Sequence, residues 1–168
     1  NMNFGPVVDV GSGSDLGTRS FGDDPSTVSS FTDVIITAQE KASIASVVKH
    51  WPGIGGGVTD PHLALADGEP IDELRAEDLM AFDRAIAAGA SGVMVAHVVI
   101  PGLTGEDEPA SLSRSAITDE LRGRQGFDGL VVTDSLGMGA IVNTTPQDEA
   151  AEKAILAGAD IALVSGTD

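Results

Sequence analysis

The chain has 168 residues, 42% of them hydrophobic and 21% charged, which suits one globular domain with a single hydrophobic core. Its formal net charge is -17, because 26 acidic residues outweigh 9 Lys and Arg, and this argues against nucleic acid or an anionic membrane as a partner. A neutral or weakly charged small substrate fits this charge better, and the absence of cysteine excludes disulfides and thiolate metal sites.

No apolar run reaches the length of a membrane span, and no signal-peptide pattern is present. The sequence opens at Asn1 and enters a predicted strand within a few residues, so we expect it to begin inside a longer protein. The compartment, bacterial cytoplasm or export, is therefore left open.

Five apolar runs with strand character alternate with helical patterns. The predicted strands cover residues 3–10, 44–50, 92–99, 130–133 and 161–164. The predicted helices cover residues 25–42, 71–88 and 146–158, with a further helix that begins after Ser111 or Ser113 and ends at 122–125. This alternation predicts a parallel sheet covered by helices, an α/β fold.

Two of the helices carry clear end signals and core stripes. Asp24 is the predicted N-cap of the first helix, with Pro25 at its first position, and Gly89 closes the helix 71–88. The residues predicted to face the core are Val28, Phe31, Ile35 and Ile36 in the first helix and Leu74, Leu79, Phe82 and Ile86 in the second.

Polar side chains stand where the strands end. Lys49 and His50 close the strand 44–50, and the carboxyl ends of strands are where α/β folds place their chemistry. A glycine-rich loop follows at residues 53–57, and it carries Asp60 and His62. We expect this loop to move and to bring an imidazole with its own carboxylate to a bound substrate.

The stretch VVKHWPGIGGGVTDPH, residues 47–62, resembles the signature of glycoside hydrolase family 3 in its β-N-acetylglucosaminidase (β-hexosaminidase) branch. Further blocks resemble that family in the same order: NFGPVVDV, GTRSFGDDP, VMVAHVVIPGL, GFDGLVVTDSLGMGAI and GADIALV. Two positions depart from the pattern: Ile54 replaces a second His, and Pro61 replaces a Ser between Asp60 and His62. The resemblance covers essentially the whole chain.

The resemblance implies a (β/α)8 TIM-barrel fold, of which residues 1–168 match strands four to eight. The chain is then a partial catalytic barrel domain of about five β/α units. We expect the other strands to come from the rest of the protein or from a second copy. Without them the arc would expose two edges and an apolar inner face, to which the sequence assigns Val8, Val48, Val95, Val132 and Leu163 or their neighbours.

The resemblance also implies roles for individual residues. Asp134, after the strand 130–133, matches the nucleophile of a retaining glycosidase. His62 matches the general acid/base, with Asp60 orienting and charging it. Arg19, Lys49 and His50 match sugar-binding positions. His97 and Met138 are candidate wall residues of the site, and His97 could equally be a buried structural residue. Trp51 and Met138 fit packing better than stacking against a sugar.

The leading interpretation is therefore a hydrolase that removes a non-reducing β-linked N-acetylglucosamine from cell-wall muropeptides. A phosphorylase with the same site is an alternative, because a His acid/base does not repel phosphate as a carboxylate would. An inactive fragment that only binds sugar is a third. No cofactor is implied, and no metal site is predicted, since the three His are spread apart.

Overall fold

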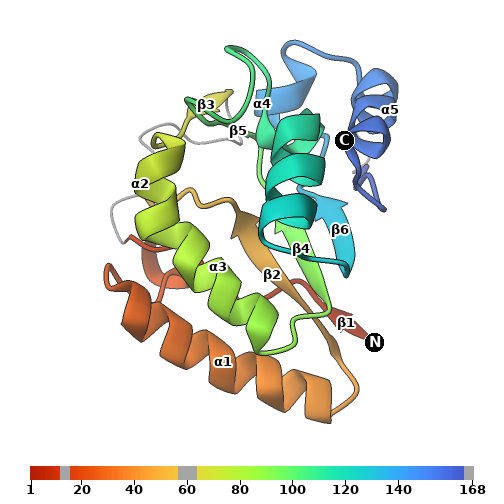
Figure 1. Cartoon of the computed structure of the whole chain (residues 1–168). Coiled ribbons are helices and arrows are strands. Elements are labelled where there is room, and N and C mark those ends of the chain that lie inside the picture. The colour runs from red at the N-terminus through yellow and green to blue at the C-terminus, as the bar shows by residue number, and fades with distance from the viewer. Residues whose placement is uncertain (12–15, 57–63, 165–168) are drawn as a thin grey trace.

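The computed structural model describes residues 1–11, 16–56 and 64–164. At its centre lies a parallel sheet in the order β1 (Met2–Asn3), β2 (Ala45–Trp51), β4 (Gly92–Val95) and β6 (Leu130–Thr133). Helices α1 (Pro25–Lys41) and α3 (Asp78–Ala87) lie side by side in front of it, and α5 (Gln147–Ala157) lies beyond β6 (Figure 1). The predicted α/β architecture with a parallel sheet is confirmed.

The register of the sheet aligns the carboxyl ends of its strands. Val48 of β2 pairs with Val93 of β4, which pairs with Val131 of β6. The first and last predicted strands are shorter than expected: beyond β1 the first makes a bridge from Val7 to Lys49, and the last makes one from Ile161 to Val132. A proline, which has no N–H to donate, interrupts the first of them at position 6.

The N-terminal helix begins as its capping signal predicts. Asp24 accepts a hydrogen bond from the backbone N–H of Thr27 at 2.9 Å, and Pro25 takes the first helical position. Phe31 differs from the prediction, because it is 53% exposed and stacks on Phe21 with ring centroids 5.4 Å apart. Ser29 and Thr32 take part in the buried face instead, with Val28 and Ile36.

The predicted helix 71–88 is two helices, α2 (Ile71–Ala76) and α3, which meet at Glu77 with φ -124° and ψ -84°. Its core stripe is nonetheless correct, because Leu74, Leu79 and Phe82 are buried. The loop before it contains a short strand, β3 (Ala66–Asp67), which pairs with β5 (Val98–Val99). The predicted strand 92–99 is thus divided between β4 and β5.

The helix expected after Ser111 or Ser113 is a π-helix, η3 (Ser115–Arg124), preceded by a 3-10 turn, η2 (Ala110–Leu112). Its wider turn shows at the end, where the N–H of Gln125 donates to the carbonyl of Glu120, five residues earlier. Neither serine caps it. The remaining elements are the 3-10 turn η1 (Gly17–Arg19) and the short helix α4 (Gly139–Val142).

The apolar residues form two clusters, one on each face of the sheet. The larger lies under the helices, and it contains Val8, Val48 and Val95, which the sequence assigned to the inner face. The smaller contains Val47, Met94 and Val132, with Leu163 packed against them. The sequence named these residues or their neighbours, and for β2 and β4 it is the neighbours Val47 and Met94 that join Val132 and Leu163, because strands that are apolar on both faces do not show in the sequence which side chains face inward.

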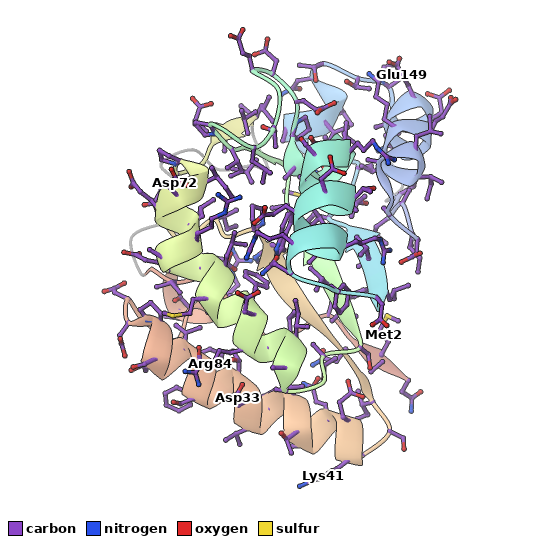
Figure 2. The ribbon with its side chains drawn as sticks, in the orientation of Figure 1. Met2, Asp33, Lys41, Asp72, Arg84 and Glu149 are labelled. Carbon is purple, nitrogen blue, oxygen red and sulfur yellow. The ribbon has the colours of Figure 1, made fainter. Side chains whose placement is uncertain are left out.

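The inner-face cluster is also better covered than the sequence predicts, since Val47, Met94 and Val132 are at most 4% exposed. Exposed apolar side chains stand at the two edges of the arc, at Met2 (46%) and Ile161 (41%). Figure 2 shows Met2 at one of these edges. In the described ranges no helix is both long and apolar enough to cross a membrane.

Candidate active site

The candidate site lies at the carboxyl ends of the central strands. Lys49 and His50 belong to the last residues of β2, His97 follows β4, and Asp134 follows β6. Because β4 lies between β2 and β6 in a parallel sheet, these residues share one edge. Asp60 and His62 lie outside the described residues, so their predicted roles stay predictions.

A buried hydrogen-bonded pair fixes His50. Asp9, which is fully buried, accepts hydrogen bonds through Oδ2 from the backbone N–H and from Nδ1 of His50, both at 2.9 Å. Its Oδ1 accepts the backbone N–H of Ile54 at 2.9 Å. With Nδ1 directed at Asp9, the ring can use Nε2 for a ligand. Asp9 was missed as a site residue, although an acid at the end of an apolar run was a usable signal.

Backbone contacts hold Asp134 at the end of β6. Its N–H donates to the carbonyl of Val95 at 2.8 Å, and its Oδ1 accepts the N–H of Ser135 at 2.7 Å. The residue is half-buried. A carboxylate on a rigid strand end, partly open to solvent, is suited to act as a nucleophile or an electrostatic partner toward a bound substrate.

His97 is fully buried and both of its ring nitrogens are engaged. Nε2 lies 2.9 Å from the carbonyl of Ser135, which can only accept, so Nε2 carries the proton. Nδ1 lies 2.7 Å from the hydroxyl of Ser111. This geometry favours the structural role for His97 over the wall role, since the ring joins η2 to the backbone beside Asp134.

The other predicted site residues differ in their setting. Lys49 is half-buried, with its backbone paired to the segment after β1 through Pro6 and Val8. Arg19 is exposed in η1. Met138, half-buried, is the N-cap of α4.

The beginning of the glycine-rich loop is closely packed. A Cβ on Gly55 would lie 1.8 Å from the carbonyl oxygen of Val10, and one on Gly53 would lie 2.4 Å from Cγ of Asp78. A Cβ on Gly56 would lie 2.1 Å from Oε1 of Glu69. Glycine at these positions permits close approach rather than only motion, which the sequence had suggested as its purpose.

Three carboxyl groups gather beside this loop, on Glu69, Glu77 and Asp78, with one oxygen of each within 4.8 Å of the others. Burial, followed by repulsion from Glu77 and Glu73, raises the pKa of Glu69. An acidic cluster does not by itself define a cation site, and Oδ1 of Asp78 already accepts the N–H of Val10. We therefore assign no metal to it.

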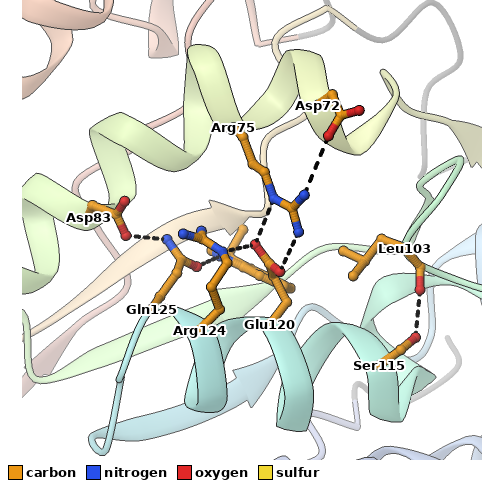
Figure 3. A network of polar contacts seen from close by, with 9 residues as sticks. Asp72, Arg75, Asp83, Leu103, Ser115, Glu120, Arg124 and Gln125 are labelled. Carbon is orange, nitrogen blue, oxygen red and sulfur yellow. Dashed lines mark hydrogen bonds and ion pairs between the residues drawn. The ribbon is translucent and has the colours of Figure 1, made fainter.

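A polar network among η3, α2 and α3 supports the same region (Figure 3). Buried Glu120 of η3 binds Arg75 of α2 at 3.0 Å and also pairs with Arg124. Burial would raise the pKa of Glu120, but the hydrogen bonds from the two arginines outweigh it and lower the pKa.

The neighbouring Gln125 extends this support to the strand that carries His50. It accepts the indole N–H of Trp51 at 2.7 Å and donates to Asp83 of α3 at 2.7 Å. Trp51 is fully buried, which confirms its assignment to packing. The network thus joins η3, α2 and α3 to the residue that follows His50.

Comparison with known proteins agrees with this geometry. The Glycosyl hydrolase family 3 N terminal domain matches residues 1–168. A beta-hexosaminidase of Stenotrophomonas maltophilia is 40% identical over 98% of the chain and 49% of its own length. The chain therefore spans about half the length of the curated relatives it matches.

Solved structures give the same result. A family 3 beta-N-acetylglucosaminidase from Paenibacillus has a TM-score of 0.93 at 38% identity, covering 98% of this chain and 32% of that one. LpqI of M tuberculosis has a TM-score of 0.92 at 40% identity, covering 98% and 50%. Such neighbours are TIM-barrel-type, and the parallel sheet is consistent with part of that barrel. By sequence and by fold, the chain belongs to glycosyl hydrolase family 3.

Proposed function

We propose that this protein is a retaining β-N-acetylglucosaminidase that releases a non-reducing β-linked N-acetylglucosamine. The observation that carries the proposal is the placement of Asp134 at the same carboxyl edge as the His50–Asp9 pair. The names of the relatives, beta-hexosaminidase and beta-N-acetylglucosaminidase, support this substrate class. Lys49, His50 and Arg19 are proposed to hold the sugar hydroxyls.

In the first step, a carboxylate oxygen of Asp134 bonds to the anomeric carbon while the glycosidic C–O bond breaks. His62, supported by Asp60, gives its proton to the leaving oxygen. In the second step His62 takes a proton from water, whose oxygen replaces Asp134 at the anomeric carbon. Two displacements return the original β configuration.

Muropeptides from peptidoglycan are the proposed natural substrates. Their N-acetylglucosamine presents hydroxyls and an amide, which suit the cationic and imidazole donors of the site. A strongly acidic protein surface does not favour polyanionic substrates. We also propose that the remaining strands of the barrel complete the site, supplied either by the rest of the protein or by a second copy of this chain.

Trapping of the glycosyl-enzyme tests the proposal. The full-length protein is incubated with a 5-fluoro N-acetylglucosaminyl fluoride, which reacts quickly in the first step and slowly in the second. We expect a mass increase of one glycosyl residue on the peptide that contains Asp134. A label elsewhere, or turnover with an inverted product by NMR, would reject the mechanism.

A turnover assay separates hydrolysis from phosphorolysis. Turnover is followed with and without inorganic phosphate, and the products are analysed for the sugar 1-phosphate. Free N-acetylglucosamine in both cases supports the hydrolase. Formation of the 1-phosphate would show that phosphate is the acceptor at the same site.

A further inference from the structure

Asp78 is a buried acid that the catalytic proposal does not use. It is the first residue of α3 and is 2% exposed. Its Oδ1 accepts the backbone N–H of Val10 at 2.9 Å, and Val10 directly follows Asp9. Gly53 packs on the same carboxyl group, because a Cβ there would lie 2.4 Å from its Cγ. One side chain thus contacts both the segment after β1 and the start of the glycine-rich loop.

The two segments that meet at Asp78 also contact each other. A Cβ on Gly11 would lie 2.6 Å from the carbonyl oxygen of Gly55, and the Gly55 position approaches Val10 in turn. Asp9 accepts the N–H of Ile54 at 2.9 Å from the same loop. A change at Asp78 can therefore reach His50 through Asp9, since Asp9 binds both.

Within the part of the chain that the structure describes, the charged groups that shift the pKa of Asp78 are acidic. They are Asp9 from the segment after β1, Glu69 from the segment before α2, and Glu77 at the break between α2 and α3. Burial, together with repulsion from these groups, raises the pKa of Asp78 to about 8, against the lowering effect of the Val10 N–H. At neutral pH this residue is mainly the uncharged acid.

We propose that Asp78 is a positioning residue that holds residues 53–56 against the segment carrying Asp9, and that its ionisation releases this contact. An ionised Asp78 would be a buried anion among three other carboxylates, and the protein can lower that cost by admitting water between the two segments. Residues 53–56 precede Asp60 and His62 in the sequence. For activity, the inference rests on the proposed function.

The first test measures the contact itself, without activity. Amide exchange is recorded for Val10 and residues 53–56 of the full-length protein in EDTA between pH 6 and 9, and converted to protection factors. We expect at least a tenfold loss of protection across pH 8 in the wild type. Asp78→Asn, which is neutral at every pH, should keep its protection. Wild-type protection that does not change with pH overturns the proposal.

A second variant keeps the test decisive if Asp78→Asn does not fold. Glu77→Gln removes one charge that repels Asp78 and leaves the Val10 hydrogen bond in place. The loss of protection should then move to lower pH, because ionisation of Asp78 becomes easier. Asp128→Asn, an exposed site on a distant loop, is the matched control and should leave the transition unmoved. A shift in the control alone contradicts the proposal.

The pH dependence of the stability of the fold gives an independent test, and the direction of the change can be predicted. The folded pKa of Asp78 lies above the ordinary value of 3.8, so its protonated form stabilises the fold at low pH. That contribution is lost as pH rises from about 4 to about 8. Over this range the unfolding midpoint of the wild type should therefore fall relative to that of Asp78→Asn. Above pH 9 the two midpoints should change with pH in parallel. Parallel curves throughout would contradict the inference.

The last measurement is the pH dependence of kcat/KM. The wild type should lose kcat/KM above pH 8, and Asp78→Asn should retain activity at pH 7 with its alkaline limb moved to higher pH. If no variant is active but protection behaves as expected, the proposed function fails and this inference stands. If the enzyme is active and Asp78→Asn shows the same alkaline limb and the same pH-dependent loss of protection as the wild type, the inference fails alone.

Discussion

Oδ2 of Asp9 accepts two hydrogen bonds from His50, one from the backbone N–H and one from Nδ1, each at 2.9 Å. Both groups are almost completely buried, so the pair is shielded from solvent. Such a carboxylate fixes the orientation and the tautomer of an imidazole in the same way as the acid of a catalytic triad. The Nε2 atom of His50 is thereby oriented before any substrate arrives, and in the neutral ring it can accept a hydrogen bond.

Asp9→Asn tests this relationship. The amide cannot accept from both His50 and Ile54 through two oxygens, so one buried N–H loses its partner. We expect a destabilisation of about 1–3 kcal/mol. We also expect a loss of about 100-fold in kcat/KM from misplacement of His50, mainly through KM. Asp23→Asn, at an exposed site, is the control, and unchanged kinetics in Asp9→Asn would reject the orienting role.

Asp134→Ala should abolish the glycosyl-enzyme, because no nucleophile remains at the end of β6. The cost in the barrier is on the order of several kcal/mol, more than a positioning residue costs. Azide, a small anion that fits the vacated space, should restore turnover of an activated aryl glycoside and give the glycosyl azide of opposite configuration. Near wild-type hydrolysis in Asp134→Asn would remove Asp134 from the role of nucleophile.

His62→Ala should affect substrates according to their leaving groups. An aryl glycoside with a stable phenolate needs little protonation, whereas a sugar leaving group needs a general acid. We expect a much larger loss of kcat/KM on the disaccharide than on the aryl glycoside, and a smaller version of the same pattern in Asp60→Ala. Equal losses on both substrates would show that His62 is not the acid.

The sequence predicts the central strands and the carboxyl-edge position of His50 and Asp134 because these features are local. A continuous apolar run followed by a polar residue marks a buried strand and its end. The same holds for Asp24, whose capping bond reaches only three residues along the chain. The strongest local signals therefore coincide with the parts of the fold that were predicted correctly.

The binding partners of Asp9 and Asp78 could not be predicted, because they are distant in the chain. Asp9 binds a residue 41 positions away, and Asp78 binds one 68 positions away. In the sequence Asp78 lies inside the predicted helix 71–88, where an acidic residue is ordinarily exposed to solvent. The sequence also could not show which side chains of the central strands face which side of the sheet. Val47 and Val48, for example, are both apolar but face opposite sides.

The last prediction concerns residues 1–168 as an isolated chain. The inner-face residues Val47, Met94 and Val132 are buried, so the exposed apolar side chains that belong to the sheet lie at its edges. Met2 and Phe4 stand at one edge, 46% and 42% exposed, and Ile161 and Val164 at the other, 41% and 53% exposed. Exposed parallel edges of this kind offer unpaired backbone groups beside apolar side chains.

We therefore expect the isolated chain to self-associate or to bind a hydrophobic dye, as measured by analytical ultracentrifugation and dye fluorescence. Lysine at both edges, in the double variant Met2→Lys and Ile161→Lys, should reduce association because each charge opposes edge pairing. Leu156→Lys removes an apolar side chain that is 68% exposed on α5, away from the edges, and should reduce it less. If the edge variant and Leu156→Lys reduce association equally, the contact does not depend on the edges of the sheet. If the isolated chain is a monomer that melts cooperatively and does not bind the dye, the edges need no partner.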